Sequence, residues 1–306
     1  MNDAHRDDAP RVIHRSCESM RELDDDSVTL TVTSPPYFDA MDYTRFDARD
    51  RAKHKARTYK EGFDGYDQYL ALMQRIASEL YRVTRPGGFC AVVVGSIQSR
   101  GRCYPIPTDL SSRFRDLGWL IHHELIWHKA RSVMDRAGVF VQHPYPGYFH
   151  PNKYTEDILV FRKPGPKLFE GVDQAKKDAA RVEITPLMTR DVFNDVWAIS
   201  PVYGESLEHP CPFPEEIPHR LISLYSYPGD LVLDPFAGSG QTLKVARALG
   251  REAVGYELEA QFAELARLRS TEPMKLRERQ LILRAETIEG DPFIPIYKDG
   301  ARELDR

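Results

Sequence analysis

The sequence lacks the features of a membrane protein, a disulfide-rich secreted protein or a strongly basic nucleic-acid binder. No run approaches about 18 apolar residues, and residues 1–10 are polar and charged, so we expect no membrane span and no signal peptide. The four cysteines have neither metal-ligand spacing nor the spacing of a disulfide framework, which suits a reducing compartment. The net charge of -4 requires that any contact with nucleic acid come from local patches. We therefore expect a cytoplasmic protein that needs no metal.

A chain of 306 residues, 42% of them hydrophobic, is long enough for one large α/β domain. Apolar runs typical of strands alternate with segments whose apolar residues recur at helical spacing. Strands are predicted at 12–15, 28–33, 89–94, 124–128, 157–161, 231–236 and 253–258, and helices at 66–83, 107–118, 214–225, 242–249 and 261–269. Thr108 is the predicted N-cap of the helix at 107–118. This alternation predicts a mostly parallel sheet with helices on both faces.

A small-residue turn separates the strand at 231–233 from the following helix. Its sequence is Asp234-Pro235-Phe236-Ala237-Gly238-Ser239-Gly240. Gly238 and Gly240 would let the backbone approach a ligand, and the helix beginning near Gln241 offers free N–H groups to a carboxylate. The next strand ends in Glu257, where an acidic side chain can accept hydrogen bonds from ribose hydroxyls.

Leu243 stands where the third glycine of a dinucleotide-binding turn would be, which favours S-adenosylmethionine over a nicotinamide cofactor. The alternative is a turn that only packs a helix on a strand.

A second turn, Thr33-Ser34-Pro35-Pro36-Tyr37, closes the alternating apolar run at 28–32. An exocyclic amine of cytosine or adenine is a poor nucleophile because its lone pair is delocalised into the ring. The Ser34 hydroxyl and the Pro35 carbonyl, fixed by the bend at Pro36, can accept both N–H hydrogens, and Tyr37 offers a surface on which the base can stack. Such a site works by positioning the amine against the methyl donor, and it needs no metal or covalent nucleophile. The alternative is a strand that ends in a proline turn with Tyr37 as packing.

Together, these motifs resemble the amino-group DNA methyltransferases of the permuted β arrangement, in which the catalytic motif precedes the cofactor motif. The resemblance runs from about residue 12 to 270. It includes the segment 208–218 before the cofactor turn, and the segments Ile126-Trp127-His128-Lys129 and 154–161, which resemble strands beside the target-base pocket. It implies a Rossmann-like class I methyltransferase fold with a circularly permuted, seven-stranded sheet. It also implies that serine at position 34 selects the N4 amine of cytosine, whereas N6-adenine enzymes more often carry aspartate there.

The resemblance implies a role for each site residue. The catalytic residues would be Ser34, Pro35, Pro36 and Tyr37. The residues that bind S-adenosylmethionine would be Asp234, Phe236, Ala237, Gly238, Ser239, Gly240, Thr242, Glu257, His209, Phe213 and Pro214.

We expect residues 1–270 to form the methyltransferase domain and 271–306 to form a peripheral tail. Within the domain, 38–65 is the expected DNA-contact loop, 163–207 the target-recognition segment and 208–270 the cofactor-binding part. The basic residues of the loop are Arg45, Arg49, Arg51, Lys53, Lys55, Arg57 and Lys60. Their position next to Tyr37 favours phosphate contacts near an extruded base, although charge runs are usually solvated surface.

The expected activity is site-specific methylation of cytosine N4 in double-stranded DNA by base flipping. Methylation of adenine N6, and a non-catalytic nucleic-acid-binding protein on the same fold, stay open as alternatives. Methylation of RNA or protein amino groups is less favoured, because those relatives carry asparagine before Pro-Pro. A separate cognate restriction endonuclease as partner, and a monomer or a homodimer, also stay open.

Overall fold

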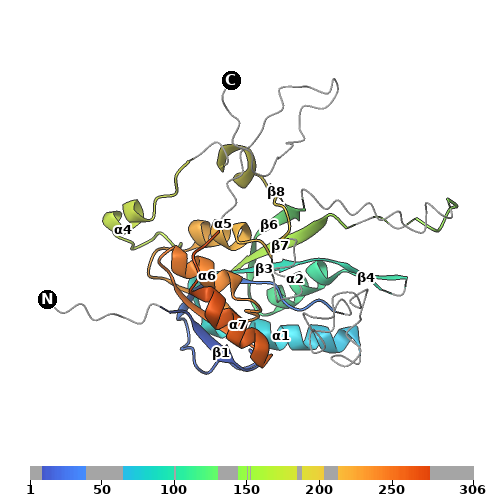
Figure 1. The fold of residues 1–306 in the computed structure, drawn as a ribbon, viewed down its shortest axis with the longest axis horizontal. Coiled ribbons are helices and arrows are strands. Elements are labelled where there is room, and N and C mark those ends of the chain that lie inside the picture. Colours follow the sequence, from blue (N-terminus) through green and yellow to red (C-terminus); the bar gives the residue numbers. More distant parts are fainter. Residues whose placement is uncertain are drawn as a thin grey trace, which may run out of the picture.

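The computed structural model describes residues 9–38, 65–99, 101–129, 144–149, 151, 153–184, 188–202 and 213–275. Most of these residues belong to one large sheet and the helices packed against it (Figure 1). The strands of this sheet are β1 (Arg11–His14), β2 (Val28–Thr33), β3 (Thr84–Val94), β6 (Leu120–His128), β7 (Thr155–Arg162), β8 (Val196–Ala198), β9 (Leu231–Asp234) and β10 (Glu252–Glu257). Two further strands, β4 (Ile97–Ser99) and β5 (Arg102–Tyr104), form a separate hairpin.

The strand order in the large sheet is β1-β10-β9-β2-β3-β7-β6-β8. Five neighbouring pairs are parallel, and β7 runs antiparallel to both β3 and β6. The central strands β2 and β3 are buried along most of their length, as expected for parallel strands covered on both faces. The predicted mostly parallel sheet is therefore confirmed. It has eight strands where seven were expected, because the short strand β8 adds to its edge.

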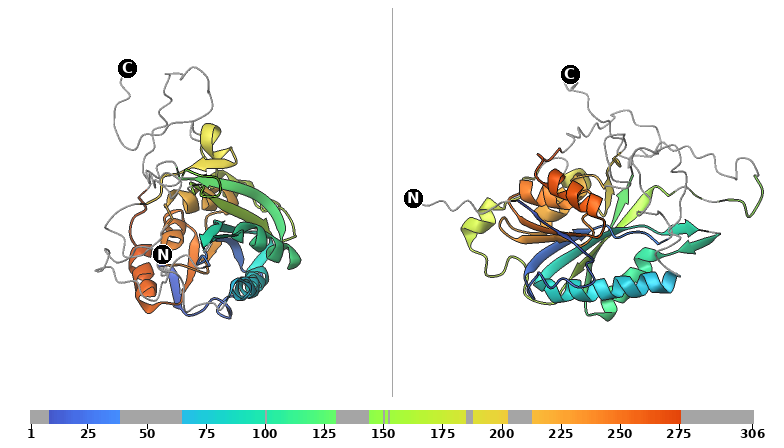
Figure 2. Two further views of the ribbon diagram at one scale, coloured as in Figure 1. Left: turned by 90° about the vertical axis from the view of Figure 1, so that its right-hand side faces the viewer. Right: turned by 60° about the horizontal axis from the view of Figure 1, so that its bottom comes forward.

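Helices cover both faces of the sheet (Figure 2). One face carries α1 (Tyr66–Val83) and α2 (Ile106–Asp116), and the other carries α5 (Glu216–Tyr225), α6 (Gln241–Ala248) and α7 (Ala260–Ser270). Each face has its own apolar core, with Leu80 and Phe114 in one and Leu221 and Val245 in the other. Two short helical segments, α4 (Gln174–Ala179) and the π-helical turn η2 (Met188–Val192), lie between β7 and β8.

Several predicted boundaries are wrong, for local reasons. Thr108 is not an N-cap, because α2 already begins at Ile106, with Pro105 at the N-cap position and Pro107 in the first turn. The helix predicted from Pro214 begins at Glu216. The segment Arg85–Gly88 does not follow α1 as a loop but belongs to β3. The pairing of β2 with β3 shifts register between Val28 and Leu30, opposite the part of β3 that contains Pro86, Gly87 and Gly88.

Candidate active site

Three parallel strands end side by side and bring the two predicted turns to one edge of the sheet. Thr31 of β2 pairs with Leu233 of β9, so the Ser34 turn and the Asp234 turn begin at the same level. Strand β10 pairs with β9 on its other side and ends at Glu257. Crevices at the carboxyl ends of such strands are where α/β proteins bind ligands.

The carboxylate of Asp234 connects the two turns directly. The Thr33 hydroxyl donates a hydrogen bond of 2.7 Å to Asp234 Oδ1, and the backbone N–H of Phe236 donates to the same oxygen at 3.0 Å. Asp234 is 1% exposed and Thr33 2% exposed, so this link lies away from water. Burial raises the pKa of Asp234 to about 6, against the opposing effect of the hydrogen bonds from Thr33 and Phe236. Asp234 therefore fixes the shape of both turns.

A second bond joins the same two halves. The Thr242 hydroxyl, in the first turn of α6, donates to the backbone carbonyl of Val32 at 3.2 Å. Thr242 is fully buried, so the start of α6 is held against the end of β2. The end of β2 and the turn at Asp234 are thus held together by two buried hydrogen bonds, although 201 residues separate Thr33 from Asp234.

Glu257 organises the other side of the cofactor turn. Its Oε2 accepts the backbone N–H of Gly238 at 2.9 Å, and its Oε1 accepts that of Glu259 at 2.9 Å. Burial raises the pKa of Glu257, and hydrogen bonds from the backbone N–H groups of Glu259, Gly238 and Leu258 oppose that shift. A carboxylate has about four acceptor positions, so capacity remains to accept from a ligand hydroxyl. This is the group that a ribose diol requires.

The two glycines of the turn adopt left-handed backbone conformations, with φ of 51° at Gly238 and 79° at Gly240. A Cβ at Gly240 would lie 2.9 Å from the backbone oxygen of Ala266 in α7. The close approach at Gly240 is therefore to another helix, which is the packing role that the sequence left as the alternative for this turn. No side chain of the described residues caps the N-terminus of α6, so its first N–H groups can face an anion.

The segment before α5 borders the cofactor turn. Phe213 accepts a hydrogen bond of 3.3 Å at its backbone carbonyl from the Gln241 side chain, and Pro214 is buried beside it. The buried Lys244 of α6 forms an ion pair of 2.7 Å with Glu215. His209, which was predicted to bind the cofactor, lies outside the described residues.

On the catalytic turn, Pro35 is buried, whereas Ser34, Pro36 and Tyr37 are half-buried. Within the described part of the chain, the Ser34 hydroxyl makes no hydrogen bond to another protein group, so it can accept one from a substrate. The Tyr37 hydroxyl donates a hydrogen bond of 2.8 Å to Glu156 Oε2 in β7. The other oxygen of Glu156 pairs with Lys129, which follows β6.

This Tyr37–Glu156–Lys129 chain orients the tyrosine ring relative to the sheet. The Lys129 ammonium also lies 5.0 Å from the centre of the Trp127 ring. A Cβ at Gly95 would come within 3.1 Å of Glu156, so this glycine leaves room for the chain. Roles for Thr33 and Glu156 were missed from the sequence, although both residues lie inside the motifs that were recognised.

A cluster of aromatic rings begins at Phe38, directly after the turn at Ser34. Phe38 contacts Tyr66 at 5.2 Å and Tyr104 at 5.0 Å between ring centres. The Tyr66 hydroxyl donates to Asp109 at 2.7 Å, which fixes the start of α1 against α2. The sequence did not predict this cluster, because its rings come from three separate segments.

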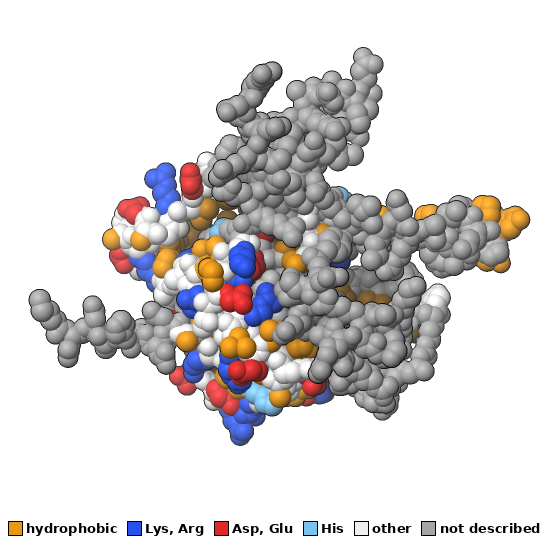
Figure 3. Space-filling model, in the orientation of Figure 1, with side chains coloured by type: hydrophobic (Ala, Val, Ile, Leu, Met, Phe, Trp, Pro, Cys, Tyr) orange, Lys and Arg blue, Asp and Glu red, His pale blue; other side chains and the backbone are white. Residues whose placement is uncertain are grey.

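The predicted DNA-contact residues Arg45, Arg49, Arg51, Lys53, Lys55, Arg57 and Lys60 all lie outside the described residues. On the face shown in Figure 3, acidic and basic side chains of the described residues are interspersed.

A family model described as DNA methylase, for N6 and N4 enzymes, matches residues 28–268. The chain belongs to this family. The Type II methyltransferase M.MjaI of Methanocaldococcus jannaschii is 30% identical over 81% of this chain and 87% of its own length. The Type II methyltransferase M.MthZI of Methanothermobacter thermautotrophicus is 29% identical over 90% of this chain and 79% of its own length.

Two solved structures share the fold of this methylase. The TTHA0409 protein of Thermus thermophilus, in complex with S-adenosyl-L-methionine, is 29% identical over 85% of this chain and 94% of that chain, with a TM-score of 0.63. The PvuII DNA methyltransferase, named as cytosine-N4-specific, is 18% identical over 88% of each chain, with a TM-score of 0.62. The methylase therefore has the S-adenosylmethionine-dependent methyltransferase fold, and its substrate is DNA.

The cofactor turn fits S-adenosylmethionine. Glu257 keeps acceptor capacity for a ribose hydroxyl, and the start of α6 can face a carboxylate. Across the described ranges, no group of histidine, cysteine or acidic side chains could hold a metal ion. None of the helices in these ranges is both long and apolar enough to cross a membrane.

Proposed function

We propose that this methylase transfers a methyl group to the exocyclic N4 amine of cytosine at specific sites in double-stranded DNA, after flipping the base out of the duplex. The observation that carries the proposal is Ser34, whose half-buried hydroxyl stands before Pro35-Pro36 at the strand end beside the cofactor turn. A hydroxyl accepts a hydrogen bond without adding a charge. An aspartate at this position would resemble the adenine-type turn.

The protein contributes to this reaction by positioning the target amine and by accepting its hydrogen bonds. Ser34 and the Pro35 carbonyl accept the two amine hydrogens, so the nitrogen lone pair turns toward the methyl donor. Bound S-adenosylmethionine would supply an electrophilic methyl group on a sulfonium whose leaving group is a neutral thioether, and the amine would release one of its two protons to solvent. Tyr37 stacks on the extruded base, and its hydroxyl bond to Glu156 sets the plane of the ring.

Asp234 and Thr33 then determine how far the amine lies from the donor. Their buried hydrogen bond fixes one turn relative to the other, so neither half can shift alone. This intact link favours an active enzyme over a non-catalytic protein on the same fold. Adenine N6 is the alternative target, since its amine has the same two hydrogens.

DNA contact is assigned to the basic loop 38–65 by its position directly after Tyr37. Within the segment 163–207, we propose that the later part recognises the DNA target. Strand β8 (Val196–Ala198) pairs with residues 126–128, next to Lys129 at the catalytic edge. Lys163, in contrast, bonds to Gly87 and Gly88 at the opposite edge.

The Type II names of the relatives support a place in a restriction-modification system, with a separate endonuclease as the partner. The proposed target is tested by incubating the purified protein with S-adenosylmethionine and unmodified bacterial genomic DNA, which is then digested to nucleosides for mass spectrometry. We expect N4-methyldeoxycytidine as the product. N6-methyldeoxyadenosine as the sole product would contradict the cytosine assignment and support the adenine alternative.

A further inference from the structure

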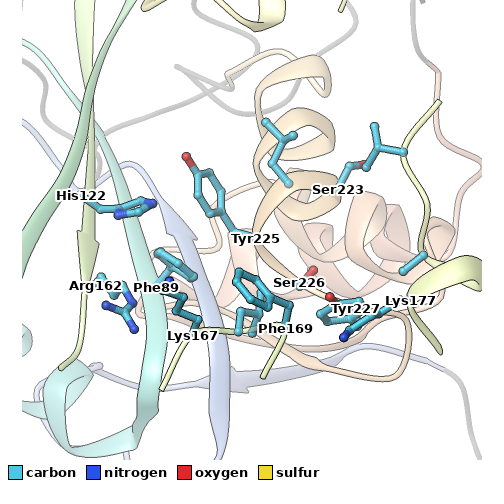
Figure 4. Close-up of a pocket in the computed structure, with 14 residues that line it drawn as sticks. Phe89, His122, Arg162, Lys167, Phe169, Lys177, Ser223, Tyr225, Ser226 and Tyr227 are labelled. Carbon is cyan, nitrogen blue, oxygen red and sulfur yellow. The ribbon is translucent and has the colours of Figure 1, made fainter. Parts of the chain in front are cut away.

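A cavity of about 450 Å³ opens at the edge of the sheet opposite the active site (Figure 4). Phe89 and Arg162, which line it, pair across β3 and β7 at the end away from Val94 and Asp157. Tyr227, also in the lining, precedes β9, whose far end carries Asp234. The cavity is therefore separated from the cofactor and target turns by the length of the sheet.

Aromatic rings form much of the cavity wall. Phe89 lies 4.9 Å from Tyr225 and 5.0 Å from His122 between ring centres, so these three rings form one packed group. Phe169, which is 53% exposed, adds a further ring from the segment after β7. In the view of Figure 4, the rings of Phe89, Phe169 and Tyr225 lie between Arg162 on one side and Lys177 on the other. Phe169 offers the exposed surface on which a planar ligand can stack, whereas Phe89 is 6% exposed and supports the wall.

Three cations line the same cavity, namely Arg162, Lys167 and Lys177. None of the lining residues that the structure describes is acidic, and no described carboxylate forms an ion pair with Lys167 or Lys177. Arg162 donates to the carbonyls of Gly165 and Pro166 at 2.6 and 2.9 Å through a single nitrogen. Its guanidinium is therefore fixed in place while other N–H groups remain for a ligand.

We propose that this cavity binds a nucleotide unit, with the base against the aromatic rings and the phosphate held by Lys167, Lys177 and Arg162. Its volume is in the usual range for small-molecule sites, about 300–1,000 Å³. The Lys167 ammonium lies 5.7 Å from the centre of the Phe169 ring, so the charge and the ring are next to each other in the wall. A simple inorganic anion would not use the rings, and an uncharged planar ligand would not neutralise the three cations. The unit can come from a free nucleotide or from a single strand of DNA. The proposal goes beyond the methylation function and does not depend on the target base.

The test uses thymidine 5′-monophosphate, because thymine has no exocyclic amine for the catalytic turn. Excess S-adenosylhomocysteine fills the cofactor site, and the affinity of the full-length protein for the nucleotide is measured by calorimetry. We expect binding to the wild type and a loss of about tenfold or more in Lys167→Ala/Lys177→Ala. The control is Arg115→Ala/Arg181→Ala, which removes the same charge from exposed positions outside the cavity. It should bind like the wild type.

Phe169→Ala separates base stacking from anion binding, since it should weaken the nucleotide but not inorganic phosphate. A thymidine tetranucleotide distinguishes the two sources. Tighter binding than the monomer, lost in the lysine variant, identifies a DNA strand, whereas binding no tighter than the monomer identifies a free nucleotide. The proposal is overturned if the wild type does not bind the monophosphate, if inorganic phosphate binds equally well, or if the control variant loses as much affinity. The calorimetry contains no methyl donor and no cytosine or adenine nucleotide, so its result is independent of the proposed target base.

Discussion

At the scale of single residues, Asp234 gives the clearest pH dependence. Its pKa of about 6 in the folded protein lies above the ordinary value of 3.8, so the folded state binds the proton more tightly. The stabilising effect of protonation is complete below pH 3.8 and is lost as the pH rises through 6. Relative to Asp234→Asn, the wild type should therefore lose about 1 kcal/mol of unfolding free energy between about pH 5 and pH 7.

Urea unfolding of both proteins at several pH values in this range measures the difference. A constant difference in unfolding free energy between the two proteins does not matter, because the prediction concerns how that difference changes with pH. Parallel stability curves would show that Asp234 titrates normally, and the account of its burial would fail.

Tyr37 offers a second test at this scale, because its ring and its hydroxyl have separate roles. Tyr37→Ala removes the stacking surface, which is worth about 1–3 kcal/mol per base. Tyr37→Phe keeps the ring and loses the bond to Glu156, so it should weaken base capture by only about 0.5–1.5 kcal/mol. Fluorescence of 2-aminopurine at the target position reports the extruded base.

Glu156→Gln should change that fluorescence about as much as Tyr37→Phe, since both alter the same bond. If Tyr37→Phe behaves like the wild type, the Glu156 contact does not orient the ring.

At the scale of elements, the contact between β2 and β9 couples the two halves of the site. Thr33→Val leaves the buried Asp234 without one donor and should cost about 1–3 kcal/mol of stability, together with slower methyl transfer. Thr33→Ser keeps the hydroxyl and should retain most of the stability and most of the rate of methyl transfer. The matched control is Thr31→Val on the same strand, because the buried Thr31 hydroxyl has no partner among the described residues. This change should be neutral or stabilising.

A double-mutant cycle with Asp234→Asn isolates the coupling, since two groups that share one hydrogen bond should show non-additive effects. Additive losses in single-turnover rate would mean that the two turns are positioned independently.

At the scale of the whole molecule, the alternation of strands and helices predicted the fold well. The strands of a parallel sheet are buried on both faces, so they appear in the sequence as continuous apolar runs. The turns at Ser34 and Asp234 were also predicted, since proline and glycine restrict the local backbone. The strand β8 was missed because three residues are too few to show the apolar alternation of a strand, and only its pairing with β6 defines it. The bond from Thr33 to Asp234 could not be predicted, because it depends on which strands become neighbours.

Ser34→Ala tests the central claim most directly, namely that the turn after β2 holds the target amine against the methyl donor. The change deletes one acceptor whose hydrogen bond strengthens as the nitrogen becomes tetrahedral, and it removes no contact that the structure shows within the fold. The single-turnover rate of methyl transfer to a duplex that carries the methylation site should fall roughly 10²–10³-fold, as for an oxyanion-hole donor, with DNA affinity near normal. A rate equal to that of the wild type would show that other groups hold the amine, and would contradict the account.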